Sequence, residues 1–173
     1  MYDARVIQKL YEDGYLTYPR TNSEYLATPE KDKIKTIINN LSKLNYPVTF
    51  KDKKTIFNDA KIESHSALTP TYKIPDIKKL TEDEKIVYKT VLKRFVAVFC
   101  ESECLVEKTE IKIKLDDEEF NLKGTVILEA GWTKYDDYTA KDKILPNLNK
   151  GDIVNINFKP VEKTTTPPKH YPI

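Results

Sequence analysis

The segment that organises the chain lies close to its start and reads Gly14-Tyr15-Leu16-Thr17-Tyr18-Pro19-Arg20-Thr21-Asn22-Ser23. Apolar residues at helical spacing precede it, and they predict a helix that begins almost at Met1 and ends at Gly14. Glycine suits that end because it adopts left-handed backbone freely. Pro19 disfavours helical backbone at the residue before it, so the segment after Gly14 is expected to be extended.

The extended segment contains a tyrosine and an arginine two residues apart. Side chains at this spacing point to the same side of an extended chain, so Tyr18 and Arg20 are expected to share a face, opposite Thr17 and Pro19. A guanidinium holds two phosphate oxygens, and its charge favours phenolate over phenol. Without such help tyrosine, with a pKa of about 10, is a weak nucleophile at neutral pH. The pair indicates attack on a phosphate, although a Tyr-Pro-Arg loop is also compatible with an ordinary turn.

The wider segment from Leu10 to Leu26 resembles the active-site segment of the type IA DNA topoisomerases. That family motif reads approximately L-Y-E-x-G-Y-I-T-Y-x-R-T-D-S-x-x-L. The resemblance implies that Tyr18 is the nucleophile and that Arg20 is the arginine of the motif. With Pro19 between the tyrosine and the arginine, the segment resembles the bacterial topoisomerase III branch, since methionine is usual at this position in the topoisomerase I branch. Asn22 stands where the family commonly has aspartate, so the role of that carboxylate does not carry over.

A second segment, Ser64-His65-Ser66-Ala67-Leu68-Thr69-Pro70-Thr71, resembles the family motif S-H-x-A-I-x-P-T. The resemblance implies that His65 lies near the scissile phosphate, where an imidazole can donate a hydrogen bond to a phosphate oxygen. The catalytic residues implied by the two motifs are Tyr18, Arg20 and His65. The implied DNA-binding residues are Arg20, Thr21, Ser23, His65 and Thr69, of which Thr69 is also expected to be structural.

Two more helices are predicted before residue 103. Thr28-Pro29-Glu30 starts the first with a hydroxyl cap and proline at the first helical position, and the helix ends before Pro47. Thr81 and Glu84 form a capping box that starts the second, which has a broad apolar face. Residues 46–60 are expected to be loop or irregular structure.

The hydrophobic period changes after Cys104, and a β segment is predicted there. Alternation over residues 110–115 and 120–128, with a turn at 116–118, predicts an antiparallel hairpin, and residues 153–158 predict another strand. The predicted fold is therefore α+β: a helical active-site-tyrosine domain (1–103, N-terminally truncated), then an antiparallel β segment (104–173, C-terminally truncated). Local matches resemble the family's β-rich gate domain: Gly131-Trp132, Leu145-Pro146, Gly151-Asp152 and Thr166-Pro167-Pro168.

Composition narrows the function classes. With 29 Lys+Arg and 27 Asp+Glu the net charge is +2, so any DNA contact must come from local clustering rather than a basic domain. Cys100 and Cys104 are interpreted as reduced thiols, and the chain has too few histidines beside them for a zinc site. A signal peptide and a membrane-spanning run are not expected, so the expected location is cytoplasmic and nucleoid-associated.

The resemblance implies a fragment of a type IA topoisomerase, an isomerase that relaxes or decatenates DNA without ATP. It implies cleavage and rejoining of single-stranded DNA through a 5′-phosphotyrosine intermediate. It also implies Mg²⁺ in the intact enzyme, held by an acidic cluster in a Toprim domain that this sequence lacks. The fragment is therefore expected to bind no metal and to be inactive alone. Its expected partners are single-stranded DNA and the remainder of its own polypeptide, with no membrane.

Two alternatives remain open at this point. One is a non-catalytic single-stranded DNA-binding gate module, in which Tyr18 stacks on a base. The other is a strand transferase similar to the tyrosine recombinases. That chemistry needs several arginines and a tyrosine near the end of its domain, whereas Tyr18 lies at the start of this chain.

Overall fold

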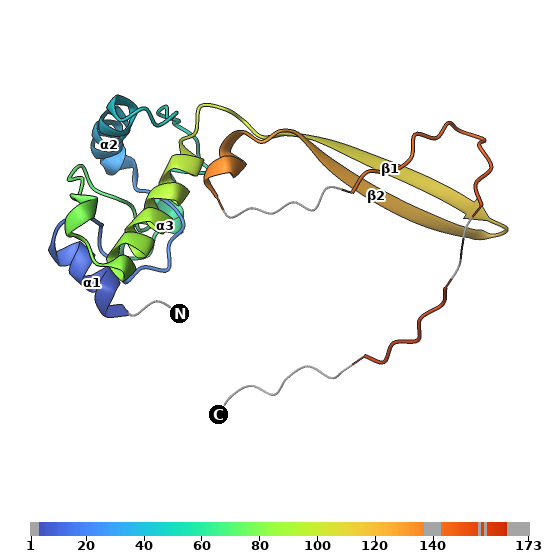
Figure 1. The fold of residues 1–173 in the computed structure, drawn as a ribbon, viewed down its shortest axis with the longest axis horizontal. Helices are drawn as coiled ribbons and strands as arrows, with labels where there is room; N and C mark the ends of the chain where they lie inside the picture. The colour runs from blue at the N-terminus through green and yellow to red at the C-terminus, as the bar shows by residue number, and fades with distance from the viewer. Residues whose placement is uncertain (1–3, 137–142, 156, 158, 166–173) are drawn as a thin grey trace.

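The computed structural model of the chain describes residues 4–136, 143–155, 157 and 159–165. The helices α1 (Ala4–Glu12), α2 (Lys31–Lys43) and α3 (Glu82–Val98) come first, and the strands β1 (Leu105–Leu115) and β2 (Glu118–Glu129) follow. The helices gather at one end of the molecule, and the hairpin of β1 and β2 extends away from them (Figure 1). This arrangement confirms the α+β fold class.

α3 is the central helix of the helical part. Its buried Phe95 and the buried Phe99 that directly follows the helix belong to one apolar cluster with α2. Its Val87 and Tyr88 belong to a second cluster with Leu10 of α1. Leu92 of α3 packs against both clusters, so the two cores are continuous through this helix. Burial raises the pKa of Tyr88 to about 12, so its phenol stays neutral.

Of the two predicted helix starts, the one at Thr81 is confirmed and the hydroxyl cap predicted at Thr28 is not. The capping box of α3 is confirmed: the Glu84 N–H donates to Thr81 Oγ1 at 3.3 Å, and the Thr81 N–H donates to Glu84 Oε2 at 2.8 Å. The hydroxyl cap at Thr28 is wrong. A short 3-10 helix, η1 (Thr28–Glu30), precedes α2, so Thr28 lies inside the helical turn. Its N–H donates instead to Asp59 Oδ1 at 2.7 Å.

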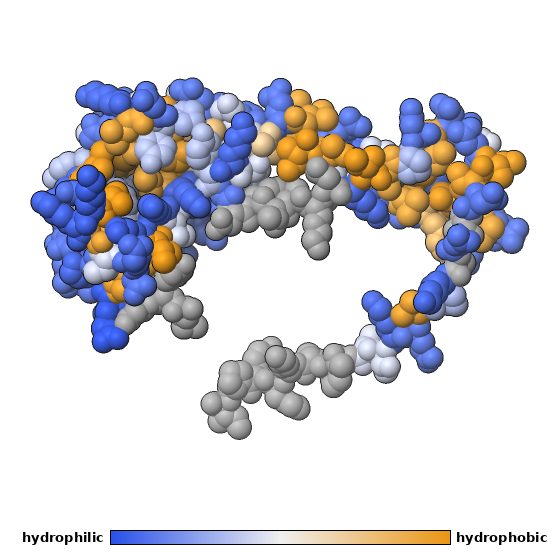
Figure 2. All heavy atoms as spheres, in the orientation of Figure 1, coloured by the Kyte–Doolittle hydropathy of each residue, from blue (hydrophilic) through white to orange (hydrophobic). Residues whose placement is uncertain are grey.

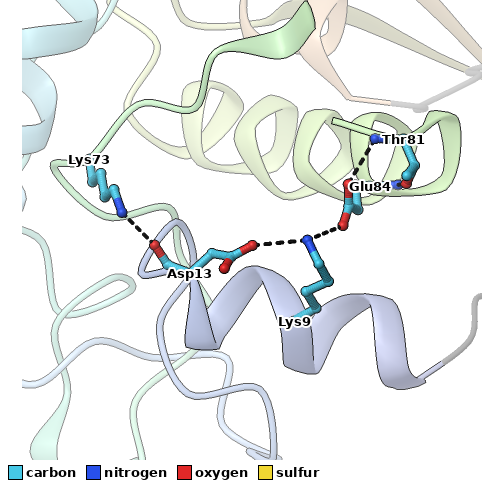
Figure 3. Close-up of polar contacts among 5 residues, drawn as sticks. All are labelled: Lys9, Asp13, Lys73, Thr81 and Glu84. Carbon is cyan, nitrogen blue, oxygen red and sulfur yellow. Dashed lines mark hydrogen bonds and ion pairs between the residues drawn. The ribbon is translucent and has the colours of Figure 1, made fainter. Parts of the chain in front are cut away.

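A polar link joins α1 to the start of α3 (Figure 3). Lys9 Nζ lies 2.6 Å from Glu84 Oε1 and 3.1 Å from Asp13 Oδ2, and Lys73 Nζ donates to the Asp13 carbonyl at 2.8 Å. The hydrogen bond from Lys9, and then that from the Thr81 N–H, hold the pKa of the Glu84 carboxyl below its usual value. Because Glu84 is only 4% exposed, these donors satisfy a carboxylate that burial would otherwise destabilise.

The hairpin is longer than the sequence pattern predicts, and most of it is exposed. Its register pairs Ile111 with Leu122 and Ile113 with Phe120, so these side chains share one face of the ribbon. Hydrophobic residues lie along it among hydrophilic ones in Figure 2.

The chain returns to the helices after β2. The 3-10 helix η4 (Gly131–Tyr135) contacts α3, Tyr135 packs against the α2–α3 cluster, and Asp136 forms an ion pair with Arg94 of α3. The division into two domains at residue 103 stays a prediction. Residues beyond it, such as Tyr135 and Asp136, pack against the helical part.

The strand predicted at residues 153–158 is wrong for the part that the structure describes. Residues 153–155 and 157 have no strand conformation, and Ile153 is 98% exposed. A strand needs a neighbour for its backbone groups, and the edge of β2 instead forms an isolated bridge between Thr125 and Lys143. Residues 156, 158 and 166–168 lie outside the described residues.

Cys100 and Cys104 are free thiols. Across the described ranges, no helix has the length and apolar character needed to cross a bilayer.

Candidate active site

The site begins where α1 ends. Gly14 has φ +78°, the left-handed conformation expected of a glycine after a helix, and its N–H donates to the Tyr11 carbonyl at 2.9 Å. The N–H of Tyr15 then donates to the Leu10 carbonyl at 2.9 Å. These bonds turn the chain sharply and bury Leu16, which is 1% exposed. The prediction that the first helix stops at this glycine is confirmed.

The two segments that carry the family motifs lie side by side and run antiparallel. The N–H of Thr17 donates to the Thr69 carbonyl at 2.9 Å, and the N–H of Thr71 donates to the Tyr15 carbonyl at 3.0 Å. The side chain of Thr17 adds a bond, because its Oγ1 accepts from the Thr69 N–H at 2.9 Å. Farther along, the Ala67 N–H donates to the Tyr25 carbonyl at 2.8 Å. This pairing explains how residues far apart in sequence form one site.

Tyr18 contacts two other aromatic rings. Its ring centroid is 4.4 Å from that of His65, with the planes tilted by 47°, and 5.4 Å from that of Tyr11, in an edge-to-face arrangement at 81°. Tyr18 is half-buried and His65 is exposed, so the site is open to a large substrate. Tyr11 is absent from the predicted site residues. Its position on the last turn of the helix that leads into the motif is the signal that would have suggested it.

Arg20 lies on the other side of a bend at Pro19. The regular alternation predicted for an extended segment is interrupted there, and Arg20 lines the same hollow as Pro19, a space of about 450 Å³ beside α1. Arg5, Lys9 and Glu12 of α1 line this hollow too, so basic side chains outnumber acidic ones in its lining. Arg20 is exposed and makes no hydrogen bond or ion pair with another described residue, so its guanidinium is available to an anion.

Thr21 and Ser23 use their hydroxyl groups to shape the loop. Thr21 Oγ1 donates to the His65 carbonyl at 2.9 Å and accepts from the Ser23 N–H at 3.1 Å. Ser23 Oγ accepts from the Tyr25 N–H at 3.1 Å. These bonds give both residues a role in holding His65 and the loop. DNA binding by them stays a prediction.

Asn22 forms a contact that aspartate would not form. Its Nδ2 donates to Glu63 Oε2 at 3.3 Å. An aspartate here would place two carboxylates against each other, whereas the amide supplies a hydrogen. The residue that departs from the family motif is therefore accommodated by a hydrogen bond.

The residues described by the structure do not fit a metal site. No group of three or more His, Cys, Asp or Glu side chains comes together within them. Mg²⁺ prefers carboxylate and other oxygen ligands, so the side chains around Tyr18 supply no such cage.

Comparison with known proteins places these features in context. A family model described as DNA topoisomerase matches residues 3–172. DNA topoisomerase 1 of Methanothermobacter thermautotrophicus is 30% identical over 178 residues, covering 96% of this chain and 23% of that protein. DNA topoisomerase 3 of Bacillus licheniformis is 31% identical over 179 residues, covering 94% and 24%. DNA topoisomerase 3 of Bacillus cereus is 31% identical over 172 residues, covering 88% and 23%. The chain thus spans about a quarter of the length of these relatives.

Proposed function

Because the chain belongs to the type IA DNA topoisomerases, we propose that it carries the nucleophilic part of an active site that cleaves and rejoins single-stranded DNA. The chain would act within a longer polypeptide, since it spans about a quarter of its relatives. That polypeptide would relax or decatenate DNA, in the cytoplasm and associated with the nucleoid.

The proposed reaction is a transesterification at one phosphodiester. Tyr18 Oη bonds to phosphorus as the bond from phosphorus to the 3′ oxygen breaks. The phenol loses its proton, and the departing oxygen gains one and becomes a 3′-hydroxyl. The strand downstream of the cut stays on the protein as a 5′-phosphotyrosine. Attack by the 3′-hydroxyl reverses each step and reseals the strand. One phosphodiester replaces another throughout, so the reaction needs no ATP.

The observation that carries the proposal is the contact of the Tyr18 ring with His65 and Tyr11, two residues before an exposed Arg20 that has no partner among the described residues. A phosphate at the Tyr18 hydroxyl would lie within reach of the exposed imidazole, which can donate a hydrogen bond to it. The Arg20 guanidinium, in its hollow beside α1, would bind the same phosphate or the next phosphate along the strand. Such donors stabilise charge that develops on phosphoryl oxygens in the transition state.

The Mg²⁺ of the proposed intact enzyme would be held outside the residues described here, in a Toprim domain. Bound there, it would supply positive charge for the phosphate. The chain's own residues would bind, orient and attack. We therefore propose that the chain is inactive by itself.

The polarity of the covalent adduct tests this proposal. Full-length protein is incubated with Mg²⁺ and one single-stranded oligonucleotide labelled at either its 5′ or its 3′ end, and the products are separated on a denaturing gel. The proposal predicts that the 3′ label moves with the protein and that the 5′ label appears on a shorter free strand. An adduct that carries the 5′ label would indicate chemistry of the recombinase kind. Binding with no adduct from either label would favour the non-catalytic gate module.

A further inference from the structure

The Tyr18 side chain is not held in place by hydrogen bonds. Within the described part of the chain, neither its hydroxyl nor its backbone N–H and carbonyl take part in one. The nearest backbone bond before it joins Thr17 to Thr69, and Pro19 after it has no N–H to donate. The direction of the Tyr18 hydroxyl therefore depends on what packs against the ring.

Two aromatic rings supply that packing. The centroid of the Tyr18 ring is 4.4 Å from that of His65 and 5.4 Å from that of Tyr11. His65 is exposed, and the proposed function assigns its imidazole to the phosphate. Tyr11 meets Tyr18 edge to face at 81°, an arrangement that aromatic pairs prefer. This contact restrains the Tyr18 ring and leaves its hydroxyl free to react.

Tyr11 is itself held firmly, because it lies on the last turn of α1. Its carbonyl accepts from the Gly14 N–H at 2.9 Å, and the preceding Leu10 is fully buried in the core. On the same turn, Lys9 is bonded to Glu84 of α3 (Figure 3). The Tyr11 hydroxyl makes no hydrogen bond to any described residue, so the ring is what this side chain contributes to the contact.

We propose that Tyr11 is a positioning residue for the nucleophile, and that its ring directs the Tyr18 hydroxyl toward the phosphate. The inference rests on the proposed function. Nucleophilic attack needs the reacting atoms about 3–3.5 Å apart and aligned, and a misplacement of about 1 Å can slow a reaction on the order of 100-fold. Tyr11→Phe keeps the ring, whereas Tyr11→Leu and Tyr11→Gln keep good helix propensity but remove the ring.

The experiment measures the rate of adduct formation by full-length protein with Mg²⁺ and saturating 3′-labelled single-stranded DNA, quenched into denaturant at set times. Tyr11→Leu and Tyr11→Gln should slow this rate about 10- to 100-fold, while Tyr11→Phe should stay within about twofold of the unmodified protein. DNA affinity should be unchanged, and the urea midpoint should fall only slightly, because Tyr11 is 37% exposed. Tyr72→Leu, the same change at a tyrosine that is 72% exposed, should leave all three measurements unchanged.

The possible failures of the inference and of the proposed function are distinguishable. If both ringless variants form the adduct at the unmodified rate, the inference is overturned and the proposed function stands. Tyr11→Phe as slow as Tyr11→Leu also overturns it, because the hydroxyl rather than the ring would then matter. A loss of DNA affinity with an unchanged rate at saturating DNA would make Tyr11 a DNA contact instead. If the unmodified protein forms no adduct, the proposed function fails and the inference fails with it.

Discussion

Replacing Thr17 with valine should destabilise the chain by removing one hydrogen bond from the paired motif segments. Thr17 Oγ1 accepts from the Thr69 N–H at 2.9 Å, and valine keeps the shape of threonine but has no acceptor. The Thr69 N–H is then left without a partner in a residue that is only 7% exposed. An unsatisfied buried donor costs about 1–3 kcal/mol. The backbone bond from the Thr17 N–H to the Thr69 carbonyl remains, so the pairing should be weakened rather than abolished.

The measurement is urea unfolding followed by circular dichroism, together with a thermal melt. A loss of about 2 kcal/mol should lower the melting temperature by about 4–8 °C in a chain of this size. Thr17→Ser keeps the acceptor and should stay close to the unmodified protein. Thr36→Val removes a hydroxyl that donates to the Asp32 carbonyl on the exposed side of α2, so it controls for the chemical change alone. If Thr17→Val is as stable as Thr36→Val, the side-chain bond to Thr69 does not support the pairing.

Three further expectations concern the packing of Gly131, the proposed phosphate contact of Arg20 and the pH dependence of stability. An added Cβ at Gly131 would lie 2.2 Å from the Glu103 carbonyl oxygen at φ +49°, so Gly131→Ala should cost about 2–5 kcal/mol in urea unfolding. Gly151→Ala should lose less stability, because its added Cβ meets no described atom within 4 Å and only the strain of the positive φ remains. Equal losses of stability in the two variants would contradict the close packing of Gly131 against Glu103. In the full-length protein, Arg20→Ala should slow adduct formation by about 100- to 1,000-fold with an unchanged urea midpoint, and a slowing below about tenfold would count against the phosphate contact. The lowered pKa of Glu84 contributes stability that is present above the ordinary pKa of 4.5 and is lost as pH falls through the pKa of the folded state. The unmodified protein should therefore be more stable than Glu84→Gln at about pH 6, and this difference in stability should shrink by about pH 3. A difference that stays constant over this range would refute the expectation.

Local signals in the sequence predicted most of the regular structure. Thr81 and Glu84 start α3 through bonds only three residues apart, and Gly14 ends α1 through its own backbone conformation. The hairpin follows from alternation on both sides of a turn. In each case the determining contacts lie within a few residues or in one hairpin, so a linear pattern suffices.

Contacts between distant segments were not predictable in the same way. Val48 and Phe57 lie in a segment correctly predicted to be irregular, yet both are buried in the core beside α2 and α3. Alternation at residues 153–158 showed that one face can be buried but not that a partner strand exists. The hydrogen bonds between Thr17 and Thr69 leave no periodic trace, so only the family resemblance brought Tyr18 and His65 together. The contact with Tyr11 emerged from the structure alone.

The most direct test of the proposed nucleophile compares Tyr18→Phe with Tyr15→Phe in the full-length protein. Removal of the Tyr18 hydroxyl deletes the attacking oxygen but keeps the ring that packs against His65 and Tyr11. Stability should change by on the order of 1 kcal/mol at most, the worth of one ordinary hydrogen bond. After incubation with Mg²⁺ and 3′-labelled single-stranded DNA, Tyr18→Phe should bind DNA but give no adduct on a denaturing gel, while Tyr15→Phe should still give one. An adduct from Tyr18→Phe, lost in Tyr15→Phe, would place the nucleophile at Tyr15 and contradict the account.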